Sequence, residues 1–529
     1  MLRPLTPLEF KRRAVRLFGR KPAIIDGDRR FTYAEFGERV DRLCNALLSR
    51  GLERGQRVAV LATNSHPLLE AYFGVPQAGA ILLPVNIRLS AREIATILEH
   101  AGASILLVDA DFAELVEQVR RRLGRPLRVV WIGERVPGRD ADEHYERMLE
   151  EASAGPPPKI DLDENDVAEL FYTSGTTGRP RGVMLTHRNL YLHALSFLVN
   201  FRCAESDVQL HTISLFHVNG WGTPQAITAI GGTHVMLRKF DVGEVLRLVE
   251  QERVTRFLAV PTMLAMILEH PDIGRYDLSS LELINTGGAP TPPEMVRRAE
   301  RLLGCQVVGG YGLTETSPLI CFAADKSYLS EASDDARIRR RASTGLPLVG
   351  TELTLFDEQG RELPWDGRTV GELVVRGNVV SPGYWKDAAA TEDSFRDGWF
   401  HTGDLATIDE EGYAHIVDRK KDIIISGGEN ISSLAIEKVL YEHPDVFECA
   451  VIGVPDDKWG EVPRAIVVLR EGAEADESDL VAFCRSRLAG FEVPQAVDLV
   501  NGLPHGGTGK ILKRTLREPF WAGKDKRVQ

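Results

Sequence analysis

A short segment rich in glycine and hydroxyl side chains carries the clearest chemical signal in this sequence. Residues 172–182 read Y-T-S-G-T-T-G-R-P-R-G, and seven of these eleven positions are Gly, Ser or Thr. Glycines let the backbone turn tightly, so that consecutive amide groups can surround an anion. Because the mainly apolar run 167–171 comes directly before, we predict a strand that leads into a phosphate-binding loop.

The loop differs from the phosphate loop of ordinary nucleoside triphosphatases, because the pattern G-x-x-x-x-G-K-[ST] occurs nowhere in the chain. A mobile Gly/Ser loop without a ligand is the alternative that the loop alone leaves open. Arg181 adds a positive charge beside the predicted anion site. The donors predicted to hold phosphate are Thr173, Ser174, Gly175, Thr176, Thr177 and Gly178.

Further motifs follow in a fixed order. They are F-H-V-N at 216–219, N-T-G-G-A-P at 285–290, G-Y-G-L-T-E-T at 310–316, T-G-D at 402–404, D-R-K-K-D at 418–422, S-G-G-E-N at 426–430 and G-T-G-K at 507–510. Together with the loop they resemble the adenylate-forming enzymes, which include acyl-CoA synthetases, aryl-CoA ligases, luciferases and carrier-loading adenylation domains. The matching stretch runs from about Phe31 to Lys510. The resemblance implies ATP and Mg²⁺ as cofactors, with coenzyme A as co-substrate.

Joining a carboxylate to a phosphate needs positive charge at the reacting centre. Glu315 stands in a neutral segment, and Mg²⁺ prefers carboxylate, phosphate and water oxygens. The resemblance makes Glu315 and Thr173 the magnesium-binding residues, and Lys510 the residue that bridges the acyl carboxylate and the α-phosphate. On local grounds alone, Glu315 could cap a turn and Lys510 could be a solvated surface lysine.

The resemblance also assigns the nucleotide and coenzyme A contacts. Tyr311 would lie against adenine, Asp404 would accept the ribose hydroxyls, and Arg419 would add a ribose or phosphate contact. The loop around Gly428 would line the pantetheine channel after the small domain has turned. The full predicted set beyond the phosphate loop is Gly288, Ala289, Pro290, Gly310, Tyr311, Gly312, Thr314, Asp404, Arg419, Lys421, Gly427, Gly428 and Glu429.

The acid is expected to bind beside the F-H-V-N motif. His217 is interpreted as pocket lining with a part in thioester formation, and ordinary core packing is its alternative. The stretch 215–222 contains no Lys or Arg for a second carboxylate, which favours an acid with a hydrophobic tail. Residues 216–221 together with 431–433 most resemble the medium- and long-chain fatty acyl-CoA synthetases, so the resemblance implies a medium- or long-chain fatty acid. An aryl-CoA ligase of the coumarate or benzoate type, or a non-catalytic adenylate-binding protein, are the alternatives. The predicted acid-binding residues are His217, Val218, Asn219, Trp221, Gly287 and Leu313.

Composition limits the other functions. The chain has 529 residues and a net charge of −12, which does not indicate nucleic-acid binding. The six cysteines are widely spaced, as expected of reduced thiols in an intracellular protein. The chain contains no run of about 18 apolar residues, so no membrane span is predicted. We therefore expect a cytoplasmic enzyme whose partners are small molecules, and a homodimer is one open alternative for its assembly.

Periodicity predicts the elements that must position these residues. Capping boxes at Thr32–Glu35 and Ser90–Glu93 precede helical patterns, and short apolar runs between helices predict parallel strands. We predict an α/β fold in which residues 1–420 form a large N-terminal domain of βαβ-type sheets, with a β-rich lobe at about 345–420. Residues 421–529 would form a small mobile α+β domain, with its hinge near Lys421.

Overall fold

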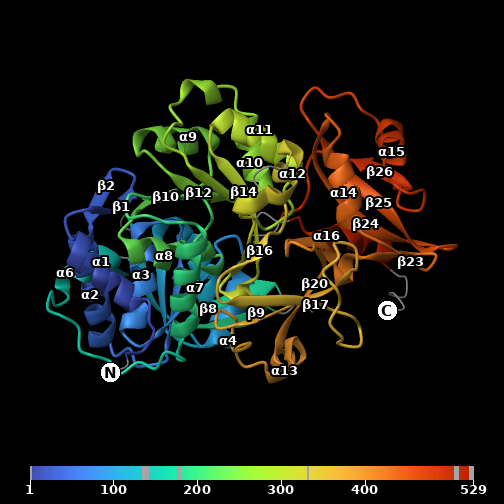
Figure 1. The fold of residues 1–529 in the computed structure, drawn as a ribbon. Helices are drawn as coiled ribbons and strands as arrows, with labels where there is room; N and C mark the ends of the chain where they lie inside the picture. The colour runs from blue at the N-terminus through green and yellow to red at the C-terminus, as the bar shows by residue number, and fades with distance from the viewer. Residues whose placement is uncertain (1–2, 134–141, 175–179, 330–332, 506–510, 523–529) are drawn as a thin grey trace.

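The computed structural model describes residues 3–133, 142–174, 180–329, 333–505 and 511–522. It has a mixed α/β fold with a large N-terminal domain and a small C-terminal domain, whose elements appear in orange and red in Figure 1. The predicted fold class is confirmed. Among these described residues, no helix is both long enough and apolar enough to cross a membrane.

The first sheet of the large domain carries the strand that leads into the predicted phosphate loop. Its strands are parallel except for the last, which returns antiparallel from that loop. In spatial order they are β7 (Glu143–His144), β6 (Arg128–Ile132), β5 (Ile105–Asp109), β3 (Arg57–Leu61), β4 (Ile81–Pro84), β8 (Val167–Ser174) and β9 (Pro180–Thr186).

The second sheet carries the N-T-G-G-A-P and G-Y-G-L-T-E-T motifs at the ends of neighbouring strands. Its interior strands are parallel, and antiparallel strands close both edges. In spatial order they are β16 (Leu346–Pro347), β15 (Leu319–Phe322), β14 (Gln306–Gly312), β13 (Leu283–Thr286), β12 (Arg256–Ala259), β10 (Val208–His211), β11 (Thr233–Met236), β1 (Pro22–Asp26) and β2 (Arg29–Thr32).

Two smaller sheets complete the chain. An antiparallel sheet holds β17 (Thr351–Phe356), β18 (Gly371–Gly377), β20 (Trp399–Ile408), β19 (Phe395–Arg396) and β21 (Ala414–Arg419). The C-terminal sheet holds β23 (Glu429–Ile431), β22 (Ile424–Ser426), β25 (Gly460–Leu469), β24 (Val446–Asp456) and β26 (Ala496–Leu499). The 3-10 turn η6 (Lys420–Asp422) connects these two sheets. The hinge at Lys421 and the domain boundaries stay predictions.

The helices begin where the sequence provides caps. Thr32 and Glu35 form a capping box at the start of α2, and Ser90 and Glu93 form one at α4, as predicted. In Figure 1, α1, α2, α3 and α8 lie together on one side of the molecule. The α-helices are α1 (Leu8–Phe18), α2 (Tyr33–Ser49), α3 (His66–Gln77), α4 (Ala91–Ala101), α5 (Ala113–Arg120), α6 (Tyr145–Glu151), α7 (His187–Asn200), α8 (Thr223–Ile230), α9 (Val242–Gln251), α10 (Pro261–Leu268), α11 (Pro293–Leu303), α12 (Asp334–Arg341), α13 (Ala388–Ser394), α14 (Ser433–Tyr441), α15 (Glu477–Arg485) and α16 (Lys513–Trp521).

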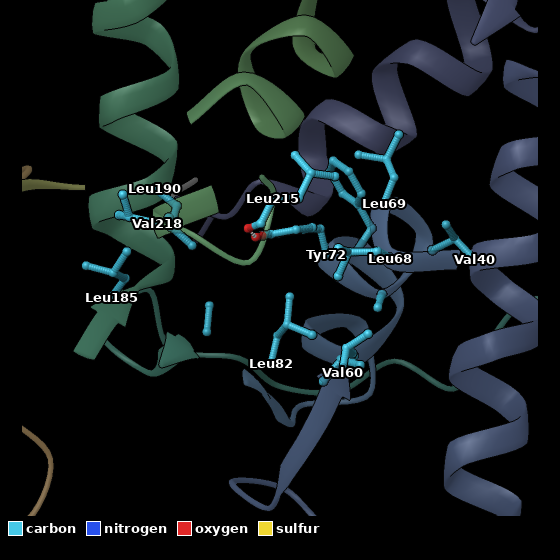
Figure 2. Packing of buried hydrophobic residues seen from close by; sticks show 14 of the residues in the cluster. Val40, Val60, Leu68, Leu69, Tyr72, Leu82, Leu185, Leu190, Leu215 and Val218 are labelled. Carbon is cyan, nitrogen blue, oxygen red and sulfur yellow. Dashed lines mark hydrogen bonds between the residues drawn. The ribbon is translucent and has the colours of Figure 1, made fainter. Parts of the chain in front are cut away.

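A buried apolar cluster joins the first sheet to the segment that carries F-H-V-N. Figure 2 shows Leu82 of β4 and Leu185 of β9 packed near Tyr72 of α3, Leu215 and Val218. The Tyr72 hydroxyl donates to the carbonyl oxygen of Leu215 at 2.5 Å. The predicted acid-binding segment therefore rests directly on the core of the large domain.

Candidate active site

The hairpin of β8 and β9 holds the predicted phosphate loop at its tip. The register places Thr173 opposite Arg181, and the strand preceding the loop is confirmed. Gly175, Thr176, Thr177 and Gly178 lie outside the described residues. The structure therefore fixes the base of the loop, where a hydroxyl and a guanidinium come from facing strands.

Glu315 lies in the 3-10 turn η4 (Thr314–Thr316), close to the base of this loop. Its carboxylate accepts a hydrogen bond from the Tyr384 hydroxyl at 2.9 Å, and the Arg181 guanidinium lies 5.3 Å from the centre of the Tyr384 ring. Burial raises the pKa of Glu315, whereas the Tyr384 hydrogen bond and the charges of Arg419 and Arg181 act to lower it. A carboxylate and cationic groups thus meet where the magnesium nucleotide is predicted.

The three residues predicted to hold the nucleoside also meet. The Tyr311 hydroxyl donates to Asp404 Oδ2 at 2.5 Å, and Arg419 Nε lies 3.3 Å from Asp404 Oδ1. Asp404 of β20 and Arg419 of β21 are directly paired across their strands, whereas Tyr311 comes from β14 of the second large sheet. The antiparallel sheet therefore places the buried carboxylate of Asp404 at the end of β14.

The glycines of the nucleotide motif have a packing reason. A Cβ on Gly312 would lie 1.9 Å from the carbonyl oxygen of Pro318, and a Cβ on Gly310 would lie 2.9 Å from Asn285 Nδ2. Both positions therefore exclude larger residues before any ligand is considered. Leu313 and Thr314 continue the segment into η4, whereas Gly288, Ala289 and Pro290 follow β13 as an exposed loop.

The predicted acid-binding wall has an unusual backbone. The 3-10 turn η2 (Val218–Gly222) is left-handed, with φ of 30° at Val218, 42° at Asn219 and 60° at Trp221. Such angles cost roughly 1–3 kcal/mol per non-glycine residue, and they persist only where the surrounding structure imposes them. A Cβ on Gly287 would lie 3.1 Å from the edge of the Trp221 ring. Val218, Asn219, Trp221 and Gly287 thus come together, with half-buried His217 directly before the turn.

The structure does not test the roles predicted for residues of the small domain. Lys510 lies outside the described residues. Gly427 and Gly428 form the exposed connection between β22 and β23, Glu429 is the exposed first residue of β23, and Lys421 lies in η6. Their roles in the pantetheine channel and at the nucleotide stay predictions.

Sequence reasoning missed two side chains that the structure places among these groups. Tyr384 lies in the motif S-P-G-Y-W at 381–385, where an aromatic residue after a Ser-Pro-Gly turn was the available signal. Glu169 is an acidic residue inside an otherwise apolar run before the phosphate loop. An acid at such a position should have prompted a search for its buried partners.

Comparisons with known proteins agree with this geometry. The family model described as AMP-binding enzyme matches residues 10–385, and its C-terminal domain model matches residues 435–510. The chain belongs to the AMP-binding enzyme family. It is 41% identical over 510 residues to a feruloyl-CoA synthase of Amycolatopsis sp, covering 96% of this chain and 98% of that protein.

Two further comparisons span nearly the whole of each chain. A 4-hydroxybutyrate–CoA ligase 2 of Metallosphaera sedula is 36% identical over 97% of this chain and 94% of its own. The crystal structure of an anthranilate CoA ligase in complex with anthranoyl-AMP superposes with a TM-score of 0.89 at 26% identity, covering 98% of both chains. The AMP-binding enzyme described here is accordingly an ATP-dependent acid–thiol ligase that forms acyl-CoA and AMP.

AMP-forming CoA ligases use ATP, Mg²⁺ and coenzyme A, and the described residues fit Mg²⁺ and the nucleoside. Glu315 and Thr173 supply the hard oxygen donors that Mg²⁺ prefers. The Asp404 carboxylate offers acceptors of the kind that hydroxyl groups need. Bound Mg²⁺ would neutralise phosphate charge. Glu315 and Thr173 are the described residues predicted to hold it, and Asp404 is predicted to orient the nucleoside.

We expect Tyr384→Phe to slow adenylate formation by about tenfold. The change removes one hydrogen bond to a carboxylate, and bonds to charged groups contribute about 1.5–3 kcal/mol. ATP–pyrophosphate exchange would measure the rate. Tyr328→Phe is the matched control, because the exposed Tyr328 hydroxyl donates to Glu411 at 2.6 Å away from these groups. Equal rates for wild type and Tyr384→Phe would show that this hydroxyl does not position Glu315.

Proposed function

We propose that this AMP-binding enzyme converts an aromatic carboxylic acid, of a size between benzoate and ferulate, into its CoA thioester. The observation that carries the proposal is the 41% identity to a feruloyl-CoA synthase over nearly the whole of both chains. The aryl-CoA ligase alternative is therefore favoured over the medium- or long-chain fatty acid that the F-H-V-N motif first suggested.

The predicted acid-binding wall supports this choice. Trp221 is 6% exposed, and its ring edge lies 3.1 Å from the position that a Cβ on Gly287 would take, so an indole ring forms part of this wall. A flat aromatic acid can pack against such a ring with an attraction beyond simple area burial. The absence of Lys and Arg from residues 215–222 also favours an acid with a single carboxylate.

A panel of acids tests the proposal. Purified enzyme would be given ferulate, coumarate, benzoate, 4-hydroxybutyrate, octanoate and palmitate, with release of AMP and formation of each thioester measured. We expect kcat/KM for the best aromatic acid to exceed that for palmitate by about tenfold or more, the scale of discrimination that a pocket supplies through a few apolar contacts. A preference for palmitate or octanoate would overturn the proposal.

The ligase activity disfavours the third alternative, a non-catalytic adenylate-binding protein. Such a protein would bind ATP yet show no exchange of pyrophosphate into ATP with any acid. The meeting of Glu315, Tyr384 and Arg181, together with Asp404 and Arg419, favours turnover. The same exchange assay therefore separates the two classes before any thioester is measured.

A further inference from the structure

A carboxyl group is buried beneath the acid-binding wall. Glu169 lies in β8 with 0% exposure, paired with Leu82 on one neighbouring strand and Leu185 on the other. Figure 2 shows these two leucines in the apolar cluster that also contains Leu215 and Val218. A carboxyl group among such neighbours is unfavourable unless it is hydrogen-bonded.

The partners of Glu169 come from the left-handed turn and the helix that follows it. Glu169 Oε1 accepts from Gln225 Nε2 at 2.7 Å, and Oε2 accepts from Asn219 Nδ2 at 3.3 Å. Asn219 belongs to η2 and Gln225 to α8, and both are buried. One carboxyl group therefore joins the strand before the phosphate loop to both ends of the segment that carries Trp221.

A second buried polar chain contacts the same turn through Thr223. The Thr223 hydroxyl donates to the carbonyl oxygen of Gly220 at 2.9 Å and lies 3.3 Å from His211 Nδ1. His211 Nε2 in turn lies 2.9 Å from His234 Nδ1. Buried hydrogen bonds at Asn219, Gly220, Thr223 and Gln225 thus surround the residues with unfavourable angles, as a strained segment requires.

We propose that Glu169 is a positioning residue that sets the acid specificity of this enzyme, because it anchors the turn Val218–Gly222 through Asn219 and Gln225. The inference rests on the proposed function to the extent that this turn binds the acid. Glu169 itself does not touch the reacting atoms. Its loss would let the turn relax and move Trp221 relative to Gly287, which changes the shape presented to the acid.

The protonation state of Glu169 follows from its surroundings. Burial raises the pKa of Glu169 to about 8, although the Asn219 and Gln225 hydrogen bonds act to lower it. Tyr72 is a titratable neighbour of Glu169. Burial raises the pKa of Tyr72 well above its usual value, so Tyr72 stays neutral. Asn219 Oδ1 and Gln225 Oε1 have no partner among the described residues. A neutral carboxyl group can donate to such an oxygen, whereas a carboxylate cannot.

This assignment gives a pH signature. The folded-state pKa lies above the ordinary glutamate value, so the contribution of Glu169 to stability is complete below about pH 4.5 and is lost as the pH rises towards 8. Glu169→Gln cannot ionise. We therefore expect the melting temperature of Glu169→Gln minus that of wild type to be larger at pH 9 than at pH 7.

Two variants and a matched control test the proposal. Glu169→Leu leaves both carboxamides unpaired, and we expect the KM for the preferred acid to rise about tenfold, with the KM for ATP within about twofold of wild type. Glu169→Gln retains an acceptor, so its KM for the acid at pH 7 should equal that of wild type. Between pH 7 and pH 9 this KM should stay constant in Glu169→Gln, whereas it should rise in wild type. Asp109→Asn is the control, since Asp109 is a buried carboxylate of the same sheet that accepts from Thr63.

Three results would overturn the proposal. The first is that Glu169→Leu has the same KM for the acid and the same acid preference as wild type. The second is that Glu169→Leu changes the KM for the acid and the KM for ATP equally. The third is that the acid KM and the melting temperature respond to pH in the same way in wild type and in Glu169→Gln. Failure of the proposed function has a different signature, since wild-type enzyme would then prefer a long-chain acid or activate none. In both of those cases the pH dependence of melting still tests the anchor, because it requires no turnover.

Discussion

Lys510→Ala is expected to slow adenylate formation by about 100- to 1,000-fold, the scale of losing one group that stabilises charge in a transition state. The resemblance of residues 507–510 to the family motif carries this expectation, because Lys510 itself lies outside the described residues. The attacking carboxylate and the α-phosphate both bear negative charge, so an ammonium between them lowers the barrier directly. ATP–pyrophosphate exchange measures this half-reaction.

Thioester formation from preformed acyl-adenylate should change by less than about threefold in the same variant. The nucleophile in that step is the thiol of coenzyme A, and the predicted turn of the small domain withdraws Lys510 before it attacks. Lys438→Ala is a suitable control, since Lys438 is exposed on α14 of the same domain. An equal loss in both half-reactions would rule out alternation of the small domain about Lys421.

Glu315→Gln is expected to slow adenylate formation by about 100-fold and to raise the Mg²⁺ concentration needed for half-maximal rate. The amide keeps the shape of the side chain and can still accept from Tyr384, so the change removes charge more than structure. Magnesium titration of the exchange rate would measure both effects. Glu411→Gln is the control, because Glu411 accepts from a tyrosine hydroxyl on the surface.

The pH profile sharpens the same test. Burial raises the pKa of Glu315, and the magnesium-binding form is the carboxylate. Because bound Mg²⁺ favours the carboxylate, this raised pKa belongs to the metal-free enzyme, and kcat/KM for MgATP should decline as the pH falls through it. Glu315→Gln should lack this acidic limb. If the variant keeps both the limb and a normal response to Mg²⁺, Glu315 does not hold the metal.

Local signals in the sequence were sufficient for most of the framework. The capping boxes at Thr32 and Ser90 predicted helices that the structure contains, and the run before Tyr172 predicted β8. These signals succeed because a cap or a strand depends on residues that are adjacent in the chain. The order of motifs, together with such elements, was enough to predict the α/β fold.

The acid was harder to predict. The F-H-V-N motif and the lack of pocket lysine or arginine favoured a fatty acid, whereas relatives over nearly the full length act, by their names, on ferulate and 4-hydroxybutyrate. Apolar residues in the wall are compatible with an alkyl chain or an aromatic ring. Shape distinguishes the two, and shape here depends on how Trp221 lies against Gly287.

The sequence by itself determined that this chain has a strand leading into a phosphate loop, helices that begin at identifiable caps, and an ordered set of motifs for joining an acid to a nucleotide. Only the tertiary structure decided that Tyr384 bonds to Glu315, that Asp404 meets Tyr311, and that Glu169 supports the turn at Asn219. The pairs are 69, 93 and 50 residues apart. Hydrogen bonds over such separations arise from the packing of whole sheets, and no local pattern encodes them.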